Sequence, residues 1–209
     1  MLDFVPNHMG PDHPWVEDHP DYFVAGSESD LARAPQNYTR VKRQRGDLIL
    51  AYGRDPYFAG WPDTLQLNYG NPATQVAMIG ELVKIAGQCD GVRCDMAMLV
   101  LPEVFERTWS ISSQPFWPRA TQRVREKSPD FCFMAEVYWD LEWTMLQQGS
   151  ITLTTNGSTT GCAMDMSVRY ASISTPDLTT KVSWLAFWKI MTSPGQRPRL
   201  RRKLMRPRP

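Results

Sequence analysis

Three short apolar runs in the first part of the chain have the length and composition of buried strands. They cover residues 2–5, 91–95 and 131–136. The second and third runs each end in a carboxylate, Asp95 and Glu136. Side chains alternate along a strand, so a residue that closes a strand is held in a defined direction at the sheet edge.

Two segments between these runs have the periodicity of helices. Residues 72–86 place apolar side chains at helical spacing, with Asn71 suited to cap the first turn and Gly87 suited to end the helix. Apolar residues over 116–124 predict a second helix. The resulting order of strand, helix, strand, helix, strand predicts a parallel α/β sheet or barrel.

Two regions lack this order. Residues 10–70 are rich in Pro, Gly, Asp and aromatic side chains, which predicts a long irregular excursion of the kind that is usually functional. From residue 150 the chain is first rich in Thr, Ser and Gly, and residues 195–209 are almost entirely Arg, Pro, Gln, Leu and Lys. We therefore expect a domain over 1–149 and an irregular C-terminal part over 150–209.

Composition excludes several classes of function. A chain of 209 residues with a net charge of +1 has no overall bias towards nucleic acid or an anionic membrane, and no apolar run is long enough to span a bilayer. The basic end is also compatible with a nucleic-acid-binding arm, which is the weaker reading. No CxxC pair occurs, and Met1 leads directly into the first strand, so we expect reduced cysteines and a cytoplasmic protein without nucleic-acid or membrane partners.

The two strand-end carboxylates are the best candidates for chemistry. Acids that close consecutive parallel strands meet at one mouth of a barrel enzyme, and a carboxylate pair is what glycosidic bond cleavage requires. Taken alone, without further motifs, Asp95 and Glu136 are better explained as strand-end acids that cap helices. A zinc site of His8, His13 and His19 is disfavoured because their spacing matches no common structural site.

Three segments in order resemble conserved regions of a known family. Asp-Phe-Val-Pro-Asn-His at 3–8, Gly-Val-Arg-Cys-Asp at 91–95 and Met-Ala-Glu-Val at 134–137 resemble the first three conserved regions of the α-amylase family, glycoside hydrolase family 13. Residues 7–15 and 66–72 resemble further segments of that family. The resemblance covers about 1–149. It implies a fragment of a (β/α)₈ TIM barrel, from the third strand to about the fifth or sixth, without the first two strands.

The resemblance implies retaining chemistry. Asp95 matches the nucleophile that forms a covalent glycosyl-enzyme intermediate, and Glu136 matches the general acid/base. Retention requires the two carboxyl groups to lie about 5–5.5 Å apart. Arg93, two residues before Asp95, is expected on the same side of its strand, where a guanidinium keeps the nucleophile ionised and oriented.

Further positions of the family pattern surround this pair. Asp3 and His8 match the pocket wall, with His8 expected to hydrogen-bond the sugar next to the nucleophile. Asn7 matches a calcium ligand of many members, so a structural calcium is compatible with the chain, although the chemistry requires no cofactor. Met98 and Leu99 replace a Lys-His pair of typical amylases, which puts long-chain starch specificity in doubt.

The fourth conserved region of the family, which contributes another Asp, is absent from the chain. Our hypothesis is that one base was lost at the codon of Gly149, because a shifted frame over residues 149–163 and 183–196, with a suitable choice of synonymous codons, reads as family-like sequence with an Asn-His-Asp motif. We therefore expect 150–209 to be an out-of-frame translation that packs poorly.

These observations predict a retaining enzyme that cleaves α-glucosidic bonds, with an α-glucan or α-glucoside as substrate. Two alternatives remain open: an inactive truncated fragment that still binds carbohydrate, and an α-glucan transglycosylase. Trp15, Trp61 and Trp139 are candidates for sugar platforms, and equally for core residues. The oligomeric state is not predicted.

Overall fold

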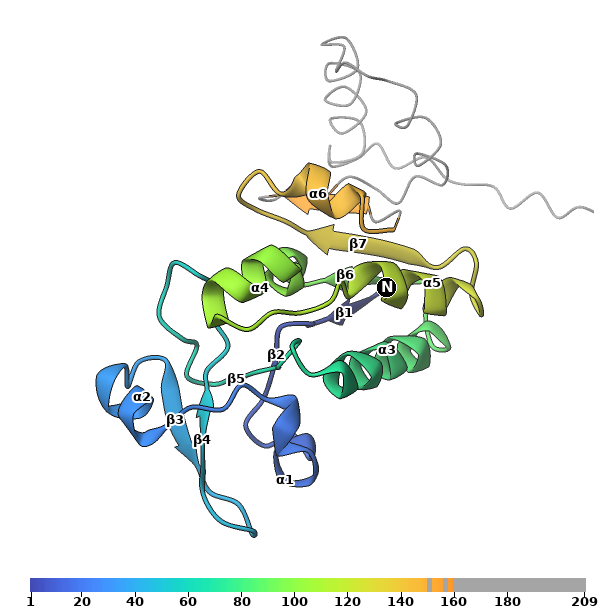
Figure 1. Ribbon diagram of the computed structural model, residues 1–209. Helices are drawn as coiled ribbons and strands as arrows, with labels where there is room; N and C mark the ends of the chain where they lie inside the picture. Colours follow the sequence, from blue (N-terminus) through green and yellow to red (C-terminus); the bar gives the residue numbers. More distant parts are fainter. Residues whose placement is uncertain (150–151, 156–157, 160–209) are drawn as a thin grey trace, which may run out of the picture. The chain divides into compact units, whose positions relative to one another are not determined.

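A five-stranded, mostly parallel sheet forms the centre of the computed structural model, which describes residues 1–149, 152–155 and 158–159 (Figure 1). These residues belong to the first of two units into which the chain divides, Met1–Cys162 and Ala163–Pro209. The first four strands are parallel and the last is antiparallel to its neighbour; in sheet order they are β1 (Leu2–Phe4), β6 (Gly91–Cys94), β7 (Cys132–Glu136), β8 (Thr152–Thr155) and β9 (Ser158–Thr159). The strands predicted from the three apolar runs are confirmed.

Helices connect the parallel strands. They are α3 (Pro72–Ala86), the short 3₁₀ turn η2 (Ala97–Val100), α4 (Pro102–Trp109), α5 (Trp117–Arg125) and α6 (Glu142–Leu146). The two predicted helices are α3 and α5, and Asn71 caps α3 by accepting a hydrogen bond from the backbone N–H of Ala73 at 2.9 Å. Sequence periodicity did not predict α4 and α6, since helices this short offer too few apolar repeats.

The register of the sheet separates an apolar face from a charged one. Phe4, Cys94 and Ala135 lie side by side on β1, β6 and β7 and are buried in the core. One residue earlier on β1 and β6, Asp3 and Arg93 are paired across the strands and point to the opposite face. The fold is therefore mixed α/β with a charged sheet face. The described strands form an open row, so the closed barrel stays a prediction.

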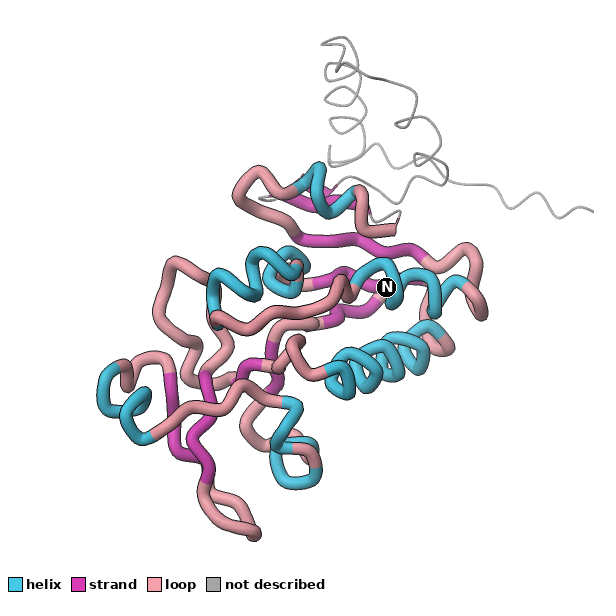
Figure 2. The backbone as a smooth tube through the Cα atoms, in the orientation of Figure 1, coloured by secondary structure: helices cyan, strands magenta, loops and turns pink. Residues whose placement is uncertain are grey.

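The excursion over 10–70 is more ordered than predicted (Figure 2). Its elements are α1 (Trp15–Asp18), the 3₁₀ turn η1 (Pro20–Tyr22), α2 (Glu28–Arg33), the hairpin of β3 (Tyr38–Val41) and β4 (Leu48–Ala51), and β5 (Leu65–Gln66), which pairs with β2 (His8–Met9). The prediction of an irregular segment was wrong here, because short helices and strands form without a periodic apolar pattern. Ser27 and Asp30 form a capping box at α2, and Leu50, Leu65 and Leu67 are buried in the core.

The expectation that the chain is irregular from residue 150 is wrong for β8 and β9. Threonine is β-branched, and Thr-rich segments form strands on an available sheet edge without strict alternation. The remainder of 150–209, including the predicted out-of-frame sequence, lies outside the described residues.

Cysteine chemistry also differs from expectation. Cys89 and Cys94 are free, but Cys132 is disulfide-bonded. The prediction of uniformly reduced cysteines is therefore wrong, and cysteine usage no longer supports a reducing compartment. Among the described residues, no helix has the length and apolarity needed to cross a membrane.

Candidate active site

Arg93 joins three carboxylates at one end of the sheet. Its Nη2 donates to Glu136 Oε2 at 2.8 Å, and its Nη1 lies 3.1 Å from Asp95 Oδ1 and 3.4 Å from Asp3 Oδ1. The sheet explains the meeting. Asp3 and Arg93 are register partners on β1 and β6, Asp95 lies two residues after Arg93, and Glu136 ends the next strand. Four of the six residues predicted for the site are thus brought together.

The turn after β6 brings a backbone N–H to the carboxylate of Glu136. The N–H of Asp95 donates to Phe4 O at 2.9 Å, which continues the β1–β6 pairing by one residue. Met96 then adopts a left-handed conformation with φ of 44°, and its N–H donates to Glu136 Oε2 at 3.1 Å. A left-handed conformation costs a non-glycine residue about 1–2 kcal/mol, so the sheet and the carboxylate must hold this turn in place.

Tyr138 supplies a further donor to Glu136. Its hydroxyl donates to Glu136 Oε1 at 2.6 Å. Sequence reasoning assigned no role to Tyr138 or to the N–H of Met96. The spacing of two residues after Glu136 was a usable signal for Tyr138, because it repeats the strand period. The Met96 donor has no such signal, since it depends on a backbone conformation that Met rarely adopts.

The protonation of the two acids is coupled. Burial raises the pKa of Asp95, and the neighbouring charge of Glu136 raises it further, against the attraction of Arg93. Burial acts in the same direction on Glu136, but hydrogen bonds from Tyr138 and the Met96 N–H, together with Arg93, lower its pKa. The surroundings thus favour protonation of Asp95 and ionisation of Glu136. Both directions oppose the ionised nucleophile and the protonated acid that the predicted roles require.

His8 lies apart from this cluster in the contacts of the described residues. It sits on β2, its ring lies 5.3 Å from the ring of Trp61, and burial lowers its pKa, which favours the neutral imidazole at pH 7. A neutral imidazole can both donate to and accept from a sugar hydroxyl.

Asn7 is buried and already hydrogen-bonded. Its Oδ1 accepts from Gln66 Nε2 at 3.0 Å, and the same Nε2 donates to the backbone O of Asn7 at 2.9 Å. Across the described ranges, no group of three or more His, Cys, Asp and Glu side chains is placed to hold a metal ion. The calcium ligand predicted at Asn7 stays a prediction.

The three candidate tryptophans have different surroundings. Trp15 packs against the core and contacts Tyr22 edge-on, at 5.2 Å between ring centroids, while Trp61 lies against His8. Trp139, one residue after Tyr138, contacts the exposed ring of Tyr57 at 5.0 Å. Only Trp139 is tied by sequence to the carboxylate cluster, so it is the best placed of the three to meet a ligand.

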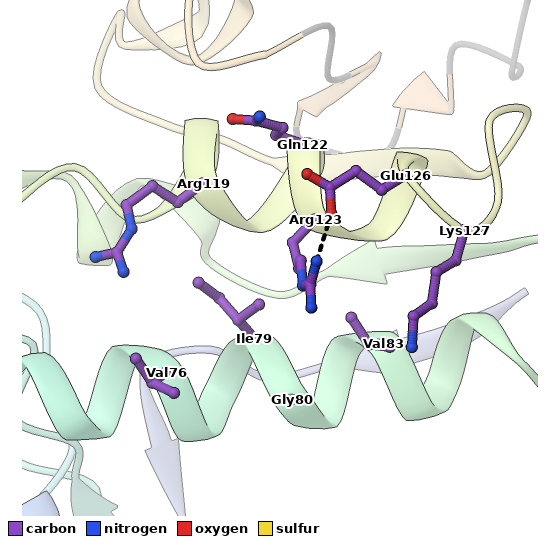
Figure 3. Close-up of a pocket in the computed structure, with 9 residues that line it drawn as sticks. All are labelled: Val76, Ile79, Gly80, Val83, Arg119, Gln122, Arg123, Glu126 and Lys127. Carbon is purple, nitrogen blue, oxygen red and sulfur yellow. Dashed lines mark hydrogen bonds and ion pairs between the residues drawn. The ribbon is translucent and has the colours of Figure 1, made fainter.

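A groove between α3 and α5 is a separate feature (Figure 3). It has a volume of about 480 Å³ and lies between Val76, Ile79 and Val83 of α3 and the polar side chains of Arg119, Arg123 and the residues near them. None of the carboxylates joined by Arg93 lines it. The groove is therefore not the candidate active site, which consists of Arg93 and the carboxylates that it contacts.

Comparison with known proteins gives only a partial likeness. No family model matches the chain, and no curated protein matches it. Solved structures that align with it include an alpha-amylase from Lactobacillus plantarum (23% identity, TM-score 0.45, covering 82% of this chain and 30% of that one). Others are isomaltulose synthase from Klebsiella sp. LX3 (17% identity, TM-score 0.47, 66% and 29%) and a debranching enzyme from Nostoc punctiforme (16% identity, TM-score 0.42, 72% and 28%). The chain spans about 30% of the length of these proteins, and a likeness at this level assigns no function.

Proposed function

We propose that the protein is a retaining glycosidase of the α-amylase type that acts on α-glucosidic bonds. The observation that carries the proposal is Arg93, which holds Asp95 and Glu136 together at the ends of two neighbouring parallel strands. A guanidinium with one carboxylate on each terminal nitrogen keeps the two acids within a few ångströms of each other. That proximity suits retention, which needs about 5–5.5 Å between the carboxyl groups. The ordered sequence motifs supply the assignment of roles.

The proposed chemistry has two displacements. The Asp95 carboxylate attacks the anomeric carbon as Glu136 gives its proton to the leaving oxygen, so the glycosidic bond breaks and a glycosyl ester forms. Glu136, now a carboxylate, takes a proton from water, and the hydroxide attacks the anomeric carbon and releases Asp95. The sugar leaves with its configuration retained, and Glu136 is protonated again.

The proposed reaction requires an ionised Asp95 and a protonated Glu136, whereas the surroundings favour protonation of Asp95 and ionisation of Glu136. Glu136 must therefore gain a proton before the first displacement. Arg93 contacts both carboxylates and can stabilise either arrangement. The entry of substrate is the natural trigger, because a sugar ring next to Glu136 alters the hydrogen bonds that hold it ionised.

The surroundings of the pair favour small substrates. Met98 and Leu99, which replace the Lys-His pair of typical amylases, are buried in the core and offer no polar contact to a leaving sugar. Tyr57 and Trp139 present aromatic rings on which a sugar can stack. We therefore propose a short α-glucoside as substrate, with transfer to a second sugar as an alternative to hydrolysis.

Hydrolysis of 4-nitrophenyl α-glucoside tests the proposal. The unaltered chain should release nitrophenol, Asp95→Ala should reduce the rate by at least about a thousandfold, and Asp130→Ala, which removes an exposed carboxylate, should not. Undiminished activity in Asp95→Ala would refute the nucleophile assignment. Sugar binding without turnover would instead identify a carbohydrate-binding fragment.

A further inference from the structure

Glu136 accepts hydrogen bonds from three donors on different segments. Arg93 on β6 and the Met96 N–H in the following turn both reach Oε2, at 2.8 and 3.1 Å, and Tyr138 reaches Oε1, at 2.6 Å. The carboxylate is only 17% exposed. Donors to both oxygens of a poorly hydrated carboxylate replace most of the water that would otherwise stabilise its charge.

We propose that Tyr138 is a positioning residue whose hydroxyl holds Glu136 in place and stabilises its ionised form. This inference deepens the proposed function and rests on it. In the proposed reaction, release of this hydrogen bond favours the protonated Glu136 that a general acid requires.

Among the three donors, Tyr138 is the one that can be released without breaking the sheet. Arg93 is fixed between Asp3 and Asp95 as well as Glu136, and the Met96 N–H is fixed by the turn that ends β6. The Tyr138 hydroxyl, in contrast, is carried on a side chain beyond the end of β7. The short distance and the ionised acceptor make it a strong donor, and Glu136 raises the pKa of Tyr138, so the phenol remains protonated at neutral pH.

The backbone after Tyr138 adds an independent reason. Trp139 and Asp140 both have left-handed φ values, 66° and 58°, which non-glycine residues seldom adopt in succession. The Trp139 ring is held against Tyr57, which belongs to the excursion over 10–70. A sugar that stacks at these rings therefore acts on a strained segment directly beside Tyr138, which links substrate contact to the Glu136 hydrogen bond.

The charged and titratable groups around Glu136 determine its pKa. They are Arg93, Asp95 and Tyr138, and Asp3 lies on the far side of Arg93. Loss of the Tyr138 hydroxyl removes a donor to the charged form of Glu136 and leaves the other three in place. The pKa of Glu136 must then rise.

The decisive experiment is a titration of Glu136 by NMR on the full chain with ¹³C-labelled glutamate carboxyls, assigned with Glu136→Gln. Tyr138→Phe should move the Glu136 midpoint to higher pH. The matched control Tyr22→Phe, whose ring packs on Trp15 and His19, should leave it unchanged. An unchanged Glu136 midpoint in Tyr138→Phe would overturn the inference. This readout needs no turnover, so it is independent of whether the proposed function is correct.

Two further measurements complete the design. If Tyr138→Phe does not fold, the reciprocal titration decides: Glu136→Gln should lower the pKa of the Tyr138 phenol, and no change would overturn the inference. With an active enzyme, the high-pH limb of kcat should move to higher pH in Tyr138→Phe, with KM changed less than about twofold. A purely structural role would reduce activity without moving that limb.

Discussion

Replacement of Arg93 by Met tests whether the ion pairs of Arg93 with Asp3, Asp95 and Glu136 stabilise the fold. Met has a similar reach and no charge, so the variant keeps much of the packing of Arg93 and leaves three carboxylates without their shared partner. Like charges then face one another at the end of the sheet. We expect the free energy of unfolding to fall.

The size of the loss follows from the contacts. Unit charges 4 Å apart attract by about 4 kcal/mol at an effective dielectric constant of about 20, but solvent screening reduces this for exposed pairs to about 0–1 kcal/mol. The Arg93 side chain is 34% exposed, Asp95 is 27% and Glu136 is 17%, whereas Asp3 is 66% exposed and contributes little. We therefore expect the Arg93–Asp95 and Arg93–Glu136 ion pairs to contribute about 1 kcal/mol each to the free energy of unfolding. The total, about 2 kcal/mol, corresponds to roughly 4–8 °C in Tm.

The pH dependence separates charge from packing. Glu136 has a lowered pKa in the folded state, so its contribution is present above its unfolded pKa and is lost as the pH falls through its folded pKa. The difference between the unaltered chain and Arg93→Met should thus be largest near pH 7 and shrink towards pH 3. Urea denaturation followed by circular dichroism at both pH values measures it, with Arg33→Met as an exposed control. A loss equal to that of the control, or one independent of pH, would refute the reasoning.

Three other outcomes are expected. Asp95→Asn should stabilise the fold by about 1 kcal/mol at pH 7 and not at pH 3, because the stability that a group with a raised pKa contributes is lost as the pH rises through that pKa. Urea midpoints at the two pH values measure this, and the opposite trend would mean that the charged form of Asp95 stabilises the fold. Asn71→Ala should cost about 1 kcal/mol through loss of the α3 cap, with an unchanged midpoint arguing that the Asn71 hydrogen bonds to Ala73 and Asp21 are not significant. Resequencing the gene at codon 149 should reveal a single-base change that restores the family-like frame, and a locus that offers no such restoration excludes the frameshift.

Much of the sheet could be predicted from sequence because its signals are local. The runs that became β1, β6 and β7 are short and apolar, and the Asn71 cap directly precedes Pro72, the first residue of α3. Asp95 and Glu136 could be found because each closes such a run. The same reasoning placed Arg93 correctly, since a spacing of two along a strand fixes its side.

The excursion and the electrostatics could not be predicted in this way. Leu50 and Leu65 are buried through pairings between distant segments, and such pairings leave no periodic trace in short strands. The lowered pKa of Glu136 depends on the hydroxyl of Tyr138 and on the N–H of one left-handed residue, Met96, and neither contact follows from composition or spacing. The resemblance implied roles for the two acids, but the hydrogen bonds that stabilise the charge of Glu136 are visible only in the structure.

The most direct test of the central claim is to trap the covalent intermediate. The unaltered chain is incubated with 5-fluoro-α-glucosyl fluoride, digested with pepsin and analysed by mass spectrometry. The account predicts a glycosyl ester on the peptide that contains Asp95, and no label in Asp95→Asn. A label on Glu136 or elsewhere, or the absence of any label on a chain that turns over substrate, would contradict it.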